Sequence, residues 1–182
     1  MKVKENMVLL SEVKANETFK TEIGEFIVLE HTEEGTKVIT KELYRENVVF
    51  GDSCDYATSA LRKLCDDEIY KEFAAVFGAE NIVEHEADLT TVDMQQDYGK
   101  VNCKVRPITF DEARKYNEAL VNAELPDWYW TITPWSTPKR GWRYTLAVVA
   151  SSGVIDYGYY DNDLGVCPFC ILKSNIFVSK GE

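Results

Sequence analysis

The segment WYWTITPWSTPKRGWRYTLAVVASSGVIDYGYY, residues 128–160, decides the fold class. Three of its pieces, 128–133, 143–152 and 153–160, are rich in the β-branched and aromatic residues that favour strands. Ser151-Ser152-Gly153 is typical of a tight hairpin between the second and third pieces. Together with GVCPFCIL at 165–172, these pieces predict four strands that form an antiparallel sheet in the C-terminal part of the chain.

The N-terminal part carries a second set of strand signals. Residues 17–43 contain two β-branched runs separated by Glu33-Glu34-Gly35, which is a hairpin signal. These runs predict a β-meander that opens the fold.

The region between the two strand sets is predicted to hold two or three helices. Apolar residues recur every three or four positions across 55–77, Asp66 or Asp67 is placed to cap a second helix there, and Gly78 is placed to end it. Residues 79–104 have no strong period and predict a long loop with short strands. The last helix should begin at the capping box Thr109–Glu112 and stop between Asn122 and Pro126, with one face made by Ala113, Tyr116, Asn117, Leu120 and Val121.

Strands, then helices, then strands indicate an α+β fold. The chain has 182 residues, of which 45% are hydrophobic, so it can bury a full core as a single domain over 1–182. No apolar run approaches the ~18 residues of a membrane span. The mixed-charge opening MKVKENMVLLSEVK does not resemble a signal peptide, so the expected compartment is the cytoplasm of a bacterial cell.

The charge is uneven. The net charge is −11, and residues 51–100 hold four Lys/Arg against twelve Asp/Glu, a local charge of −8. A broad nucleic-acid-binding face is therefore not expected, because phosphate contacts need Lys and Arg. The excess of acidic residues is sufficient to keep the protein in solution, and it also suits binding to a basic protein surface.

Cys167-Pro168-Phe169-Cys170 has the letters of a thiol redox site. Such a pair normally opens a helix near the start of a chain, whereas this one lies near the end in a β-rich segment. In one continuous strand the two cysteines would point to opposite faces, with their Cα atoms roughly 10 Å apart and too far for a disulfide. We expect buried cysteines without redox chemistry, no metal and no cofactor.

No catalytic constellation is visible. Glu84-His85-Glu86 with Asp88 lacks the spacing of a two-histidine metal helix and is predicted to be an acidic loop. No serine lies in a nucleophile elbow, and no phosphate-binding loop is present. The prediction is a protein that is not an enzyme.

Aromatic residues gather in the strands of the C-terminal part: Trp128, Tyr129, Trp130, Trp135, Trp142, Tyr144, Tyr157, Tyr159 and Tyr160. Alternation along strands predicts that Trp130 and some tyrosines are core, and that others form an exposed binding surface. Lys139, Arg140 and Arg143 lie in the same stretch and permit at most a small nucleic-acid patch at 139–143.

The order of motifs resembles a family of uncharacterised domains from gut Firmicutes, their phages and mobile elements. The matching residues are 25–29, Ser59 with Arg62 and Leu64-Cys65, 108–116, 128–134, and Ser152-Gly153 through Gly165-Val166-Cys167-Pro168. The resemblance covers about 15–178. It departs at Cys167, where relatives usually carry Arg.

The resemblance implies a C-type-lectin-like C-terminal half, and it implies no enzymatic activity. It favours a phage or mobile-element interaction protein, with an anti-CRISPR inhibitor of Cas9 as the sharpest candidate, because such nucleases hold nucleic acid in basic channels. The alternative is a lectin-like module that binds a glycan or small ligand. The predicted partner-binding residues are Asp66, Asp67, Glu68, Glu84, Glu86, Asp88, Trp135, Lys139, Arg140 and Trp142.

Overall fold

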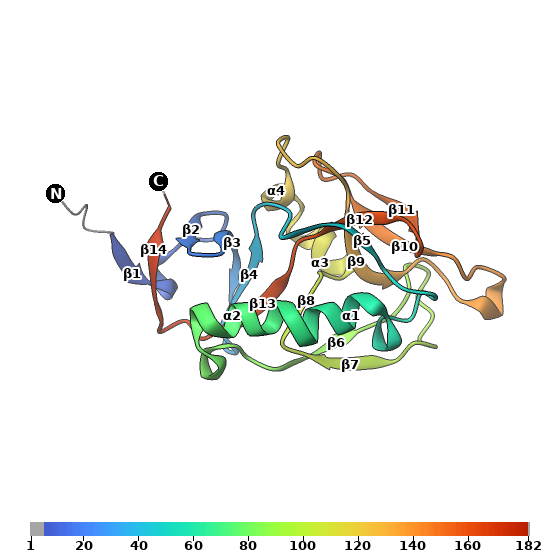
Figure 1. The fold of residues 1–182 in the computed structure, drawn as a ribbon, viewed down its shortest axis with the longest axis horizontal. Coiled ribbons are helices and arrows are strands. Elements are labelled where there is room, and N and C mark those ends of the chain that lie inside the picture. Colours follow the sequence, from blue (N-terminus) through green and yellow to red (C-terminus); the bar gives the residue numbers. More distant parts are fainter. Residues whose placement is uncertain (1–5, 182) are drawn as a thin grey trace.

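A seven-stranded antiparallel sheet is built around the predicted meander. A computed structural model describes residues 6–181 of the chain, and Figure 1 shows its fold. The sheet has the order β1 (Met7–Leu9), β14 (Phe177–Lys180), β2 (Thr18–Thr21), β3 (Gly24–His31), β4 (Thr36–Thr40), β13 (Phe169–Leu172) and β8 (Val105–Arg106). The predicted hairpin is confirmed: Thr32 and Gly35 exchange backbone hydrogen bonds at the β3–β4 turn.

One long helical run lies along this sheet (Figure 1). It follows a short 3-10 turn, η2 (Tyr56–Thr58), and consists of α1 (Ala60–Leu64), the π-helical segment η3 (Cys65–Ile69) and α2 (Tyr70–Phe77). Its buried residues recur every four positions: Leu61, Cys65, Ile69, Phe73 and Phe77. An α-helix turns every 3.6 residues, so the wider π turn helps to keep this four-residue stripe facing the sheet.

The prediction that Asp66 or Asp67 caps a second helix is wrong. Both residues lie inside the π-helical segment, where Leu64 and Tyr70 on either side also have helical dihedral angles. Gly78 ends the run as predicted, at φ +85°, a left-handed value that suits glycine. The Phe73 and Phe77 rings pack edge-on against Phe26, with centroids 5.4 and 5.3 Å away.

The C-terminal strands form a second sheet of five strands. Its order is β11 (Ile155–Tyr159), β10 (Thr145–Val149), β9 (Tyr129–Pro134), β12 (Asp163–Val166) and β5 (Arg45–Val49). The hairpin at 151–153 is confirmed by a hydrogen bond from the Gly153 N–H to the Ala150 carbonyl, 2.9 Å. The sheet is not wholly antiparallel, because Gly165 of β12 pairs in parallel with Tyr129 of β9.

The segment 165–172 is two strands rather than the one predicted. β12 ends at Val166 in the five-stranded sheet, and β13 begins at Phe169 in the seven-stranded sheet. Pro168 lies between them and has no N–H for a ladder. This short crossing ties the two sheets together near the end of the chain.

Two short helices and a hairpin complete the domain. The capping box is present at the start of α3 (Phe110–Lys115), which is followed by α4 (Asn117–Leu120). Ala113, Tyr116 and Leu120 are buried, but Val121 lies past the helix end and is 54% exposed, contrary to the predicted face. Residues 79–104 form η4 (Ala79–Asn81) and a hairpin of β6 (His85–Asp88) and β7 (Lys100–Cys103), in line with the short strands predicted there. The predicted acidic loop at 84–88 is wrong, because residues 85–88 are strand β6.

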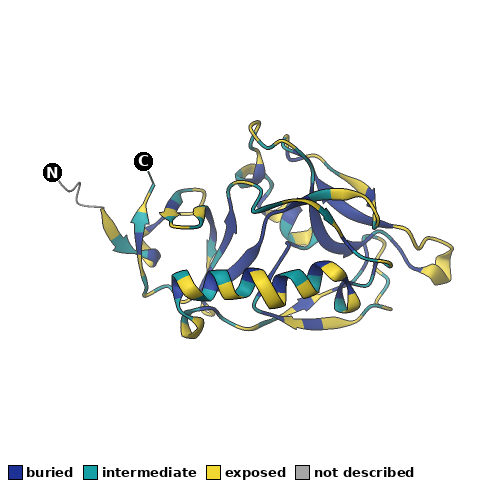
Figure 2. Cartoon of the chain, in the orientation of Figure 1, coloured by how far each residue is buried: buried dark blue, intermediate teal, exposed yellow. Residues whose placement is uncertain are grey.

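The domain has two hydrophobic cores, to which the segments coloured dark blue in Figure 2 contribute. The larger core lies between the long helical run and the sheets and includes Phe26, Phe73 and Trp130. The smaller core lies under α3 and α4 and includes Tyr129 and Phe169. The result is a single α+β domain, as predicted. No helix within residues 6–181 combines the length and apolarity needed to cross a bilayer.

The five cysteines are all buried and free. Cys167 belongs to the smaller core and Cys170 to the larger one, so the strand break sends the two thiols into different cores. Burial raises the pKa of the Cys167 thiol to about 12, and its S–H points to the Glu42 carbonyl, 3.5 Å away. A thiol with such a pKa is a poor nucleophile at neutral pH.

Candidate functional site

The three predicted acids of the long helical run are exposed, but they point in different directions. Asp66 lies on the same side of the helical run as Arg62 and Tyr70, which are four residues away, and the Arg62 guanidinium reaches the Asn102 carbonyl of β7 at 3.4 Å. Glu68 lies on the other side, together with Glu72, which binds Arg45 of β5 at 2.8 Å. Asp67 lies between these two sides and faces outward.

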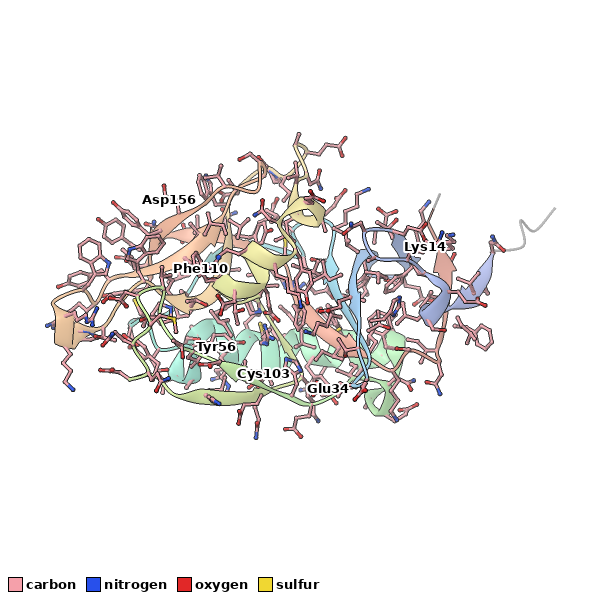
Figure 3. All side chains as sticks on the ribbon, turned by 180° about the vertical axis from the view of Figure 1, so that it is seen from behind. Lys14, Glu34, Tyr56, Cys103, Phe110 and Asp156 are labelled. Atoms are coloured by element: carbon pink, nitrogen blue, oxygen red, sulfur yellow. The ribbon has the colours of Figure 1, made fainter. Side chains whose placement is uncertain are left out.

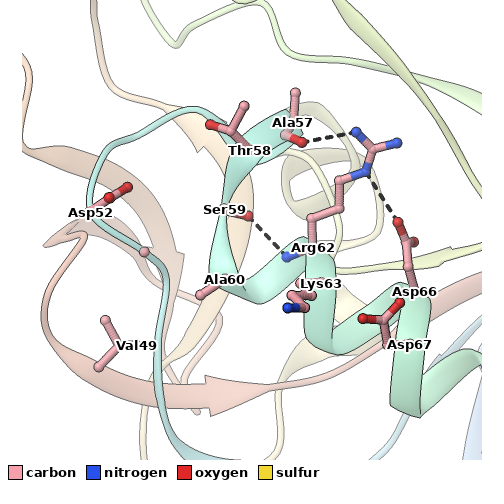
Figure 4. Close-up of a pocket in the computed structure, with 11 residues that line it drawn as sticks. Val49, Asp52, Ala57, Thr58, Ser59, Ala60, Arg62, Lys63, Asp66 and Asp67 are labelled. Carbon is pink, nitrogen blue, oxygen red and sulfur yellow. Dashed lines mark hydrogen bonds and ion pairs between the residues drawn. The ribbon is translucent and has the colours of Figure 1, made fainter.

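A shallow groove of about 740 Å³ lies beside these acids, between the start of the helical run and the loop after β5 (Figure 4). Ser59 caps the run by accepting a hydrogen bond from the Arg62 N–H, 3.0 Å, and Arg62 pairs with Asp66 at 3.3 Å. Burial raises the pKa of Asp66, and the Arg62 charge only partly opposes that effect. The groove wall therefore mixes acids with Arg62 and Lys63.

The second acidic group lies on the β6–β7 hairpin. Glu84, Glu86 and Asp88 are exposed on one side of β6, while Ala87 of the same strand faces the core. Lys100 of β7 stands opposite Asp88 and lies 3.5 Å from Glu86. Hydrogen bonds from the Thr90 side chain and backbone hold the pKa of Asp88 below its usual value and so favour its charged form.

Asp93 joins the acidic hairpin to the aromatic and basic loop. It lies in the turn of the hairpin, accepts a hydrogen bond from the Ser136 hydroxyl at 2.6 Å, and pairs with Arg140 at 3.2 Å. Burial alone would raise the pKa of Asp93, but the bonds from Ser136 and Thr91 and the Arg140 charge hold it below its usual value. Its partners lie 43 and 47 residues away in the sequence, so no local signal could have shown this junction.

Four aromatic side chains form a cluster beyond this junction, which we call the aromatic patch: the exposed Trp142, Tyr157 and Tyr159 and the half-buried Trp135. Tyr157 is central, with its ring centroid 5.6 Å from Trp135, 6.3 Å from Trp142 and 6.4 Å from Tyr159, each at a steep angle. Trp142, Tyr157 and Tyr159 are 45, 45 and 50% exposed. The Trp142 N–H donates to the Thr145 hydroxyl at 2.6 Å, so the patch has fixed geometry.

The other aromatic residues of the segment have different positions. Trp130 is core, as predicted, and its indole donates to the Val48 carbonyl at 2.8 Å. Tyr129 beside it is also buried, because β9 is covered on both faces and its two side-chain rows enter different cores. Tyr144 pairs with Tyr160 on the opposite face of the five-stranded sheet, since the register places Thr145 and Tyr159 on the patch side.

The loop around η5 (Pro138–Arg140) has fewer unpaired positive charges than its sequence suggests. Lys139, Arg140 and Arg143 are all exposed. Arg140 is neutralised by Asp93, whereas Lys139 and Arg143 have no ion-pair partner among residues 6–181. Two free cations beside the aromatic patch leave only a small area suited to a phosphate.

His85 is not a metal ligand in this arrangement. Its ring faces inward, and its Nε2 accepts a hydrogen bond from Arg106 Nε at 2.9 Å while Nδ1 faces the Val83 carbonyl at 3.2 Å. Burial, followed by the Arg106 charge, lowers the pKa of His85 to about 4. Arg106 is only 4% exposed and holds Glu112 with two bonds of 2.7 and 3.0 Å.

Comparison with known proteins gives no further guide to the site. No family model, curated protein or solved structure matches this chain. In the described part of the chain, no three His, Cys, Asp or Glu side chains gather in a group able to hold a metal ion. The remaining candidate sites are two surfaces. One is formed by the exposed acids of the helical run and the β6–β7 hairpin, and the other is the aromatic patch.

Proposed function

We propose that this protein is a non-enzymatic interaction protein whose acidic helix and hairpin bind a basic protein surface. One observation carries the proposal. Through Asp93, the hairpin that bears Glu84, Glu86 and Asp88 is fixed to the loop that bears Trp135 and Trp142. Exposed carboxylates beside rigid aromatic side chains combine electrostatic steering with the residue types that dominate binding hot spots.

The sharpest partner class is a nuclease that holds nucleic acid in a basic channel, such as Cas9 of a bacterial defence system. An acidic surface competes there with the phosphates of the guide or target. The resemblance to domains of phages and mobile elements supports this class, since such elements profit from an inhibitor.

The test is target-DNA cleavage by a panel of guide-loaded Cas9 proteins, with and without an excess of this protein. We expect dose-dependent loss of cleavage and co-elution with at least one of them. The triple variant Asp67→Lys, Glu84→Lys, Glu86→Lys should then lose inhibition. Full cleavage by every Cas9 protein of the panel, without co-elution, would contradict the proposal that this protein inhibits Cas9.

A matched control separates local from overall charge. The variant Glu22→Lys, Glu33→Lys, Glu34→Lys changes the net charge by the same amount at exposed positions of the β2–β3 and β3–β4 turns. It should inhibit as well as the unmodified protein. Equal loss in both variants would mean that net charge alone, and not the helix and hairpin surface, accounts for binding.

The second candidate is a glycan- or small-ligand-binding module, in keeping with the proposed C-type-lectin-like character of the C-terminal half. The exposed aromatic patch favours it, because sugar rings stack on flat apolar surfaces. Its edge-to-face packing leaves fewer open ring faces than a stacking platform would offer. A glycan array with no hits would argue against this candidate.

A further inference from the structure

The outer strand of the five-stranded sheet carries the aromatic patch. β11 pairs only with β10, and its other side has no strand neighbour among residues 6–181. Val154, Tyr157 and Tyr159 are 55, 45 and 50% exposed, so this edge is not covered by another part of the described chain. Exposed edge strands with apolar side chains are templates for pairing with another strand.

The register shows which backbone groups are open. The Tyr160 N–H bonds to the Tyr144 carbonyl, and the Ala150 N–H bonds to the Val154 carbonyl, so the even-numbered residues of β11 bond to β10. Ile155, Tyr157 and Tyr159 therefore direct their N–H and C=O groups outward. The Tyr157 N–H is satisfied within the chain by the Asp156 carboxylate at 2.8 Å, and the Tyr159 carbonyl accepts from Asn162.

We propose that β11 is a self-association edge, at which two copies of this chain pair their β11 strands antiparallel about a two-fold axis through Tyr157. This register places Ile155 opposite Tyr159 of the second copy and pairs all five residues of the strand. On pairing, the Tyr157 N–H exchanges the Asp156 carboxylate for the Tyr157 carbonyl of the second copy, whereas the Tyr159 carbonyl has two lone pairs and keeps the bond from Asn162. The two five-stranded sheets become continuous, and both aromatic patches lie on the same face, where the Tyr157 rings meet. This inference is independent of the proposed nuclease partner.

Charge selects this register. Asp156, labelled in Figure 3, is the one charged residue of β11, and in this pairing it faces Gly158 of the second copy. A shift of two residues in one direction would place Asp156 opposite itself, which is unfavourable. A shift in the other direction would pair only residues 157–159. The strand is therefore complementary to itself in one register.

The other edge of the same sheet is not suited to pairing. β5 carries the charges of Arg45 and Glu46, and Arg45 is tied to Glu72 of the helical run at 2.8 Å. Charged side chains on an edge strand discourage pairing. This contrast leaves β11 as the edge of this sheet at which a second copy fits.

Cysteine cross-linking tests both the pairing and its register. In the proposed dimer the two Tyr157 Cα atoms are about 5.5 Å apart, within the ~4.4–6.8 Å range of disulfides. Two Asp156 Cα atoms would be roughly 8 Å apart, because they are offset by two residues of ~3.4 Å each, and beyond about 7 Å no disulfide forms. The five native cysteines are buried and give little background.

We expect Tyr157→Cys to form a disulfide-linked species of twice the 20.8 kDa chain mass under mild oxidation, and Asp156→Cys to form no disulfide-linked species. Sedimentation of the unmodified protein over a concentration series should show reversible doubling of mass. The double variant Tyr157→Lys, Tyr159→Lys should abolish the doubling. Tyr144→Lys, which changes a tyrosine of equal exposure (52%) on the opposite face, should leave it intact.

Three outcomes would overturn the proposal. These are a mass of 20.8 kDa at every concentration, equal cross-linking of the two cysteine variants, or equal loss of doubling in the lysine variants. Preferential cross-linking of Asp156→Cys would overturn the register. Retained far-ultraviolet circular dichroism excludes misfolding as the cause. If the unmodified protein is monomeric and the Tyr157→Lys, Tyr159→Lys variant loses binding to another protein, the aromatic patch is a binding site for that protein and not for a second copy.

Discussion

His85 gives the molecule a built-in sensitivity to acid. The ring is largely buried beside the Arg106 guanidinium, and its pKa falls from 6.5 to about 4. In the unfolded chain the same ring takes up a proton near pH 6.5. Between these two values the unfolded state binds more protons than the folded state, so the stability falls as the pH falls.

The size of the effect follows from the shift. Each pKa unit corresponds to about 1.4 kcal/mol, so a shift from 6.5 to about 4 corresponds to about 3 kcal/mol at most. Because the ring retains some exposure to water, about 2–3 kcal/mol is the expected loss. This contribution to stability is fully present above pH 6.5 and is lost progressively down to about pH 4.

The measurement is urea unfolding of the unmodified protein and of His85→Gln at a series of pH values from 7.5 to 4. Glutamine does not titrate, and its amide oxygen can still accept from Arg106 Nε. As the pH falls, the free energy of unfolding of the unmodified protein should decrease relative to that of His85→Gln, with a slope of up to about 1.4 kcal/mol per pH unit. Parallel curves, or a His85 pKa near 6.5 by NMR titration, would refute the reasoning.

Two further predictions concern stability. Arg106→Met should lower the free energy of unfolding by about 3–5 kcal/mol, because it leaves the Glu112 carboxylate largely buried without its partner, and adding Glu112→Gln should recover part of the loss in a chemical-denaturation cycle. Additive effects in that cycle would contradict the pairing. Phe73→Ala should cost about 3–5 kcal/mol through loss of core packing, whereas Phe177→Ala, at a side chain 68% exposed, should stay within about 0.5 kcal/mol. Equal effects of the two phenylalanine variants in thermal unfolding would contradict the assignment of the core.

Features set by neighbours along the chain were predictable. The β3–β4 hairpin, the capping box at Thr109 and the helix stop at Gly78 all depend on residues within a few positions of one another. The α+β class follows in the same way from the order of strand and helix patterns. Burial of Trp130 was predicted, but alternation did not show that all six residues of β9 are buried.

Features set by distant residues were not predictable. The split of 165–172 between two sheets depends on which strands lie free on either side of Pro168, and this is decided only when both sheets exist. The π-helical segment depends on where the sheet lies beneath the helix. Both errors came from treating a local pattern as sufficient where long-range packing decides.

The candidate site shows the same division. The sequence by itself determined that Asp66–Glu68, Glu84, Glu86 and Asp88 are exposed acids, since charged residues rarely enter a core without a partner. Only the tertiary structure decided that Asp93 binds Ser136 and Arg140, that Tyr157 gathers Trp135 and Trp142, and that β11 is an edge. Local chemistry fixes what each residue can do, whereas chain topology fixes which residues meet, because contacts between distant segments form only when the whole core is assembled.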